Sequence, residues 1–151
     1  MPRHIIADTS VLIHFHNINR LEILRELYQE ITITLEIANE FGKPLPQWIK
    51  IKKLKDKKYQ DLINTQLDLG ESSAIALAIE NDDSLIILDD LKARKLAKRI
   101  GLNYTGTLGV INKAKENRLV DEIKPLIEEL QAVGFRISGD IIEELLKKNN
   151  E

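Results

Sequence analysis

Acidic residues at three places in the sequence could together hold a metal ion. Asp8 ends a short apolar segment near the start of the chain, Asp89 and Asp90 end a second one, and Glu71 begins an apolar helical pattern. If these side chains converge, their like charges raise one another's pKa and destabilise the fold, and a divalent cation removes that repulsion. Carboxylate oxygens without cysteine suit Mg²⁺ or Mn²⁺, which keep several waters and also bind substrate phosphates.

Hydrolysis of a phosphodiester is the reaction that we expect of such a site. A bound ion lowers the pKa of a water molecule and so supplies the nucleophile, and a second ion can stabilise the leaving oxygen. Glu40 lies near the end of a predicted helix and could face the same cleft as Asp8 and Asp90. No side-chain nucleophile is then required.

Each of these acids also has a purely structural explanation. Aspartate is a favoured helix N-cap, and glutamate in a first helical turn is stabilised by the helix dipole. For any one acid taken alone, this is the simpler interpretation. The prediction of a metal site therefore depends on the convergence of several acids without basic partners.

Hydroxyl and imidazole side chains near the acids have alternative roles. Ser10, Thr105 and Thr107 could hydrogen-bond a metal-bound water or a carboxylate, or could simply cap helices. His14 and His16 are two residues apart, so on a helix they point to different faces and are not expected to share a metal. Packing or surface roles are favoured for both histidines.

Basic residues at two places could contact a nucleic acid. Lys92 and Arg94 follow the aspartate pair and could position phosphates, although an ordinary solvated helix face explains them equally well. Six lysines crowd into nine residues with only Asp56 opposing them: Lys50, Lys52, Lys53, Lys55, Lys57 and Lys58. Of these, Lys52 and Lys53 are candidate RNA contacts, and a solvated surface is again the simpler alternative.

The apolar pattern indicates which elements would bring the acids together. Strands are predicted over residues 4–7, 31–33, 84–88 and 102–105, and the lysine-rich stretch is expected to begin as a short edge strand before it turns helical. Helices are predicted after residue 8 and over residues 17–28, 34–41, 70–81 and 91–100, with further helical pieces beyond residue 106.

Strands that alternate with helices favour an α/β fold with a mostly parallel sheet, because parallel strands need crossover connections. The carboxyl ends of such strands share one edge of the sheet, where ligands bind. Asp8 and Asp90 are therefore expected to meet at that edge.

Composition and length restrict the class of protein. The chain has 151 residues, of which 43% are hydrophobic, which suits a single domain over residues 1–151. It has no cysteine, so disulfides and thiolate metal sites are excluded, and the cytoplasm is the expected location. No run of eighteen apolar residues predicts a membrane span. The net charge of −2 argues against a whole-surface attraction to nucleic acid.

Six motifs in order resemble those of PIN-like domains, and most closely the uncharacterised branch related to toxin ribonucleases of toxin–antitoxin pairs. The matching segments are Asp8-Thr9-Ser10 with Leu12-Ile13, Ile33 to Phe41 with Trp48-Ile49 shortly after, Leu69 to Ala78, Leu88-Asp89-Asp90 with Arg94 and Ala97, Gly106 to Val110, and Gly134 to Ser138. The sequence departs from the branch at Thr34-Leu35, where proline is usual, and in the lysine-rich stretch between residues 50 and 66.

The resemblance implies a PIN-like three-layer sandwich, with a central parallel sheet flanked by helices and a helical C-terminal extension over about residues 107–149. It implies that Asp8, Glu71 and Asp90 are the core metal-binding acids and that Glu40 is a further catalytic acid. Asp89 is an additional candidate ligand, because the plain pattern has one acid at this place. The implied activity is that of an endoribonuclease that requires Mg²⁺ or Mn²⁺.

The resemblance also implies partners, namely a second copy of the chain in a homodimer and a small antitoxin whose segment enters the acidic groove. Apolar positions near the C-terminus could form an interface or could simply pack a terminal helix on the core, and the second is favoured: Ile137, Ile141, Ile142, Leu145 and Leu146.

Two other functional classes are compatible with parts of the sequence. A non-catalytic PIN-like module would bind RNA or protein without cleaving it. A phosphohydrolase or receiver domain is less well supported, because Ser10 stands where a second aspartate is expected and residues 34–49 offer no acceptor aspartate after a middle strand. Glycine-rich nucleotide-binding loops are absent.

Overall fold

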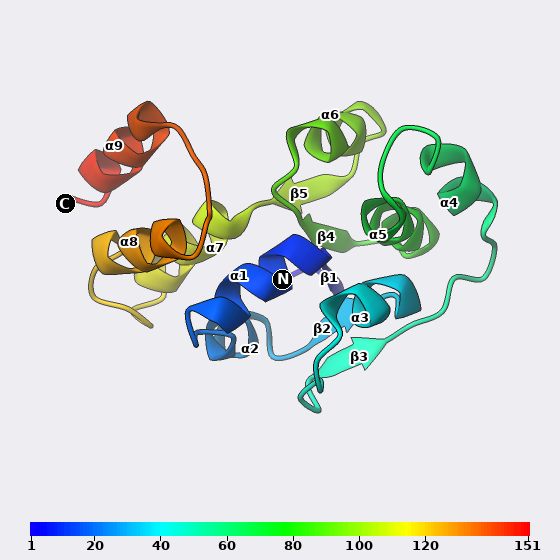
Figure 1. Ribbon diagram of the computed structural model, residues 1–151, viewed down its shortest axis with the longest axis horizontal. Helices are drawn as coiled ribbons and strands as arrows, with labels where there is room; N and C mark the ends of the chain where they lie inside the picture. Colours follow the sequence, from blue (N-terminus) through cyan, green and yellow to red (C-terminus); the bar gives the residue numbers. More distant parts are fainter.

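The computed structural model describes residues 1–151 and has a five-stranded sheet whose strands are all parallel (Figure 1). The strands are β1 (His4–Ala7), β2 (Ile31–Ile33), β3 (Ile49–Ile51), β4 (Ser84–Ile87) and β5 (Asn103–Thr105), in the order β3-β2-β1-β4-β5. The α/β fold predicted from the alternation of strands and helices is confirmed.

Nine helices connect and cover the strands. They are α1 (Thr9–Asn17), α2 (Glu22–Tyr28), α3 (Leu35–Phe41), α4 (Lys58–Ile63), α5 (Leu69–Glu80), α6 (Leu91–Arg99), α7 (Thr107–Glu116), α8 (Lys124–Ala132) and α9 (Gly139–Lys148). Figure 1 shows α1 and α2 on one side of the sheet and α4 and α5 on the other. This gives the three layers that the sequence predicts.

The strand order reverses next to β1, and this reversal creates the site. The chain adds β2 and β3 on one side of β1 and then returns to place β4 and β5 on the other. Ala7 is in register with Ile87, and the backbone N–H of Asp8 donates to the carbonyl of Ile87 at 3.0 Å. The residues after β1 and β4 therefore leave the sheet side by side, at the place where ligands bind in open parallel sheets.

Helix α5 is the most deeply buried helix and fixes the position of Glu71. Every residue from Gly70 to Ala78 is buried, because the helix lies against β1 and β4 and is covered by α3 and α4. Its serines satisfy their hydroxyls locally: Ser72 donates to the carbonyl of Asp68 at 2.6 Å and Ser73 to that of Gly70 at 2.8 Å. Small residues allow the helix to approach the sheet closely.

The predicted helix over residues 17–28 ends where α2 ends but starts too early, because α1 continues to Asn17 and α2 begins only at Glu22. The chain forms α1 and α2 with a break between them, where Asn19 adopts a left-handed backbone conformation with φ of 58°. Asparagine tolerates this conformation better than most residues. The apolar spacing continues across the break, and periodicity alone could not show it.

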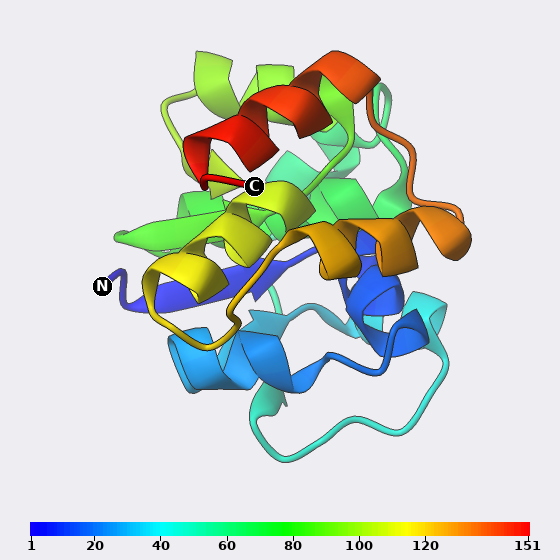
Figure 2. The same cartoon turned by 90° about the vertical axis from the view of Figure 1, so that its left-hand side faces the viewer.

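The C-terminal part of the chain packs beside the sheet as α7, α8 and α9, which face the viewer in Figure 2. Val110, Ile111, Leu126 and Leu130 are buried in the main core, whereas α9 has no buried residue. Lys115 anchors the end of the chain by donating to the Glu151 carboxylate at 2.7 Å. No helix is both long and apolar enough to pass through a membrane.

Candidate active site at the carboxyl ends of the strands

Asp8 lies at the N-cap position of α1, but its side chain caps nothing. Its carboxylate makes no N-cap hydrogen bond, although the backbone N–H of Thr9 lies close enough to lower its pKa, and the residue is only 3% exposed. Burial, together with the carboxylates of Asp68, Glu40 and Asp89, raises the pKa of Asp8 to about 7. The capping explanation therefore does not account for Asp8.

Glu71 reaches the same place from the first turn of α5. Its backbone N–H donates to Asp68 Oδ1 at 2.8 Å, and its own carboxylate accepts from the backbone N–H of Asp68 at 3.4 Å, which forms a capping box. Burial raises the pKa of Glu71 to about 7, helped by the carboxylates of Asp68, Asp8 and Asp90. Glu71 therefore has a structural role, as part of the capping box of α5, and also belongs to the acidic cluster.

Asp68 is an acid that the sequence analysis missed. It raises the pKa of Asp8, Glu40 and Glu71, so it lies within electrostatic reach of all three. The spacing of aspartate and glutamate at Asp68 and Glu71 is a capping-box signal that could have drawn attention to it. Its position against Asp8 and Glu40, however, depends on how α5 packs.

Glu40 lies at the exposed end of α3, beside the start of α5. Burial of its carboxyl and the charge of Asp68 raise its pKa. A Cβ on Gly70 would collide with Glu40 Oε1, so the glycine allows the start of α5 to come this close. The buried hydroxyl of Thr9 has no hydrogen-bond partner, although it lies near enough to Glu40 to lower its pKa.

Asp89 and Asp90 are adjacent in sequence but have different partners. Asp90 caps α6 by accepting from the backbone N–H of Ala93 at 2.9 Å, and its charge still raises the pKa of Glu71. Asp89 accepts from the backbone N–H and the hydroxyl of Thr107, at 2.8 and 2.5 Å. Burial alone would raise the pKa of Asp89, but these donors and nearby His14 lower it.

The predicted supporting residues fall into separate places. Thr107 is fully buried and binds Asp89, whereas Ser10 is exposed in the first turn of α1. His14 lies 3.6 Å from Asp89, too far for a hydrogen bond but close enough for an electrostatic contact, and it packs edge-on against Phe135. His16 packs against Phe41, so the two histidines do not share a site, as predicted.

The candidate RNA contacts lie in two regions. Lys92 and Arg94 lie on α6 directly after the aspartate pair, and the Arg94 guanidinium stacks on the Tyr104 ring at 5.1 Å. The side chain of Lys52 instead donates to Asn81 Oδ1 at 2.6 Å, at the far end of α5 from Glu71. Exposed Lys53 follows Lys52, so this pair lies away from the acidic cluster.

The donor chemistry of the cluster fits a hard divalent cation. Asp8, Glu40, Glu71 and Asp90 have no lysine or arginine within 4.0 Å, since the ion pairs of the structure involve other acids. Oxygen donors with unbalanced charge suit Mg²⁺ or Mn²⁺. In their present positions, no three acidic or histidine side chains form a group that could hold an ion. The ligands are therefore assigned from their chemistry and not from a coordination geometry.

Comparison with known proteins identifies one family. The model of the family DUF3368, a PIN domain, matches residues 4–151, which is nearly the whole chain. No curated protein matches the sequence.

Proposed function

The chain belongs to the PIN domain family, and from this membership we propose that it is a metal-dependent endoribonuclease that hydrolyses phosphodiester bonds of RNA. PIN domains are generally nucleases and typically use divalent metals. The coarse assignment to a nuclease-like fold follows from the family, whereas the RNA substrate and the catalytic residues of this chain are our proposal.

The observation that carries the proposal is the state of Asp8. A carboxylate that is 3% exposed, makes no cap hydrogen bond and has a pKa near 7 is unfavourable for stability in its charged form. Such arrangements are concentrated at functional sites. A purely structural aspartate would be expected to have the donors that surround Asp89.

Asp8, Glu71 and Asp90 would hold the metal ion, and Asp89 would contribute less because its oxygens already accept from Thr107. When bound, the ion supplies Lewis-acid activation of a water and of the phosphodiester. The protein's own part is to hold these carboxylates on rigid elements: Asp8 at the end of β1, Glu71 in a capping box and Asp90 as the cap of α6.

We assign to Glu40 the role of the base that takes the proton of the attacking water. Its raised pKa makes it a better proton acceptor than an ordinary glutamate, and its position at an exposed helix end gives solvent access. The charge of Asp68 contributes to that raised pKa. Ser10 and Thr107 would act at a distance, by orienting water and by fixing Asp89.

The biological setting that we propose is the toxin of a toxin–antitoxin pair, inhibited by a small antitoxin and active as a homodimer. We further treat residues 1–151 as one domain, with residues 107–149 as its helical extension. A non-catalytic module that binds RNA or protein is the alternative. The exposed apolar residues of the extension, such as Ile141, are compatible with an interface.

Cleavage of RNA by the purified chain tests the proposal. Activity should require Mg²⁺ or Mn²⁺, stop with EDTA and return when either ion is added in excess. Glu71→Gln is the matched variant, because glutamine preserves the capping box and removes only the charge. It should lose cleavage without losing thermal stability, because the charged form of Glu71 is already disfavoured, whereas Glu26→Gln at an exposed position of α2 should behave as the wild type.

Equal cleavage in EDTA, or by Glu71→Gln, would refute the metal-dependent mechanism. RNA binding without cleavage under every metal condition would instead support the non-catalytic alternative.

A further inference from the structure

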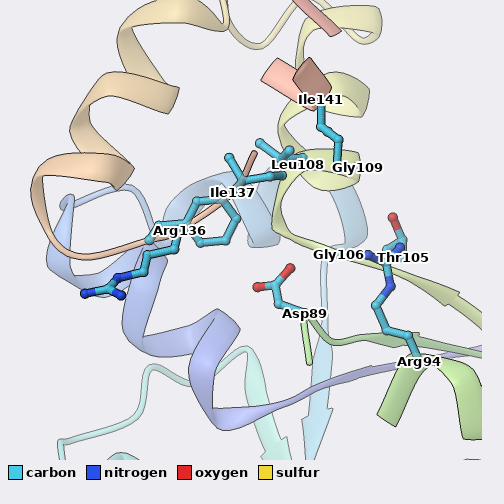
Figure 3. A pocket seen from close by; sticks show the side chains of 10 residues that line it. Asp89, Arg94, Thr105, Gly106, Leu108, Gly109, Arg136, Ile137 and Ile141 are labelled. Atoms are coloured by element: carbon cyan, nitrogen blue, oxygen red, sulfur yellow. The ribbon is translucent and has the colours of Figure 1, made fainter. Parts of the chain in front are cut away.

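A pocket of about 340 Å³ has Asp89 in its lining (Figure 3). Its volume is within the range of small-ligand pockets, roughly 300–1,000 Å³. The residues that carry the argument are Asp89, Arg94, Leu108, Arg136, Ile137 and Ile141. They come from the end of β4, from α6 and α7, from the chain between α8 and α9, and from α9 itself, so the C-terminal extension forms one wall.

Arg94 and Arg136 lie on either side of Asp89 along the lining of this pocket, and the exposed Arg136 side chain extends outward, away from Asp89 (Figure 3). Arg94 is held in place by its stacking on Tyr104, and neither Arg94 nor Arg136 has a carboxylate within 4.0 Å. Guanidinium groups match phosphate oxygens in geometry as well as charge.

The opposite side of the pocket is apolar. Leu108 and Ile137 are half-buried, and Ile141 on α9 is 50% exposed. Figure 3 shows these three side chains together, above Asp89. An apolar surface that faces a charged one suits a ligand with a flat, weakly polar part and an anionic part.

The pocket is continuous with the acidic cluster through Asp89, which lines the pocket and also raises the pKa of Asp8. Gly106 keeps this junction open, because a Cβ there would lie 2.7 Å from Asp89 Oδ1 and 3.6 Å from Arg94 Nη1. A polymer that is cut at the acidic cluster could therefore place its neighbouring unit in the pocket.

We propose that this pocket binds the nucleotide next to the scissile phosphate of a single-stranded RNA, an inference that rests on the proposed ribonuclease function. The base packs against Leu108, Ile137 and Ile141, and Arg94 and Arg136 contact the phosphates on its two sides. RNA is favoured over a peptide because two arginines line a pocket that adjoins, at Asp89, a site that suits a phosphodiester. The C-terminal extension thereby becomes part of the substrate site.

An RNA-binding measurement tests the inference. The probe is a labelled single-stranded RNA of about 12 nucleotides and mixed sequence, and its binding is measured by fluorescence anisotropy in the Asp8→Asn background with Mg²⁺. Arg94→Gln should weaken binding about tenfold and reduce the slope of log affinity against log salt by about 0.7. Arg99→Gln is the matched control, because Arg99 is exposed on the same helix and outside the pocket.

A second pair of variants tests the apolar side without changing any charge. Ile141→Gln should weaken binding about threefold to fivefold and leave the salt slope unchanged, because only apolar contact is lost. Leu62→Gln, at a 69% exposed position on α4, should change neither quantity. Both substitutions replace exposed side chains, so folding is not expected to suffer.

The outcomes separate the inference from the function on which it rests. If the wild type cleaves RNA but Arg94→Gln and Ile141→Gln bind RNA as tightly as their control variants, the pocket assignment is overturned and the nuclease function is not. Binding that depends on both residues without any cleavage would support the pocket and refute the nuclease. Absence of RNA binding would overturn both, and would make a peptide the ligand to test next.

Discussion

Asp8 and Asp89 follow neighbouring strands of the sheet, yet their surroundings shift the pKa of the two carboxyls in opposite directions. Asp8 has no cap hydrogen bond, and burial together with surrounding carboxylates raises its pKa to about 7. Asp89 accepts two hydrogen bonds from Thr107 and lies beside His14, and its pKa is lowered. The contrast shows that burial alone does not decide the pKa of an acid. Hydrogen-bond donors to the carboxylate, such as those of Thr107, also determine the pKa.

This contrast assigns different roles to two acids that look alike in the sequence. Donors stabilise the charged form of Asp89, so this residue contributes to stability by fixing the start of α7. The charged form of Asp8 is opposed by its surroundings, so this residue lowers stability unless a cation is bound. Asp89 is thus stabilised by its partners, and Asp8 is the acid that the proposed function uses to bind a cation.

The largest expected effect separates the two acids by activity. Asp8→Asn should reduce RNA cleavage on the order of 1,000-fold, or about 4 kcal/mol of transition-state stabilisation, because a ligand of the metal is lost. Asp89→Asn should reduce it by less than about tenfold. Initial rates on one RNA substrate at saturating Mg²⁺ measure both. Equal losses for the two variants would show that the comparison assigns the wrong role to Asp89.

The next largest effect is a pH dependence of stability in EDTA. A carboxyl whose pKa is higher in the folded than in the unfolded state binds its proton more tightly when the protein is folded. The stability that protonated Asp8 contributes is therefore fully present below its unfolded pKa near 4 and is lost as pH rises through its folded pKa of about 7. The free energy of unfolding should fall by about 2–3 kcal/mol between pH 5 and pH 8.

Urea denaturation at both pH values measures this fall, and Asp8→Asn provides the control. The variant should lose the part of the pH dependence that Asp8 causes and should be more stable than the wild type at pH 8. Glu71, whose pKa is also raised to about 7, should keep the remaining pH dependence. Added Mg²⁺ should restore the wild type at pH 8. A wild type that is equally stable at both pH values would mean that Asp8 is not held in an unfavourable charged state.

A smaller effect is expected on the side of Asp89. Asp89→Asn should lower the free energy of unfolding at pH 7 by about 1–2 kcal/mol, because the charge-assisted bond from the Thr107 hydroxyl and the contact with His14 are weakened. Thr107→Val should have a similar effect, and the double variant should be less destabilised than the sum of the two. Additive effects would place the two residues in separate interactions.

Much of the fold could be predicted because the elements have strong local signals. The apolar segments that end in Asp8 and Asp89 do form adjacent parallel strands, and the small apolar residues after Gly70 do form a buried helix. The start of α2 was predicted too early, since the apolar spacing continues through Asn19. A local backbone conformation of one residue leaves no trace in a periodic pattern.

The candidate site could be predicted only in part, for a different reason. The sequence indicates which acids end strands and begin helices, but the difference between Asp8 and Asp89 comes from Thr107 and His14, which belong to other elements. The reach of Asp68 toward Asp8 likewise requires the packed position of α5. Hydrogen-bond donors and charged neighbours that come from other elements of the fold cannot be predicted from the spacing of residues in one segment.

The smallest effect is expected for the lysine-rich stretch, and it tests whether charge far from the acids matters. Lys52 bonds to Asn81, which follows α5, and Glu80 at the end of that helix lies about 14 Å along the axis from Glu71. Because charges at this distance are largely screened at physiological salt, Lys52→Gln with Lys53→Gln should change kcat/KM for RNA by less than about threefold. Rates at low and physiological salt measure this. A loss above about tenfold at physiological salt would show that the substrate extends along α5, and that the acidic cluster alone does not define the RNA site.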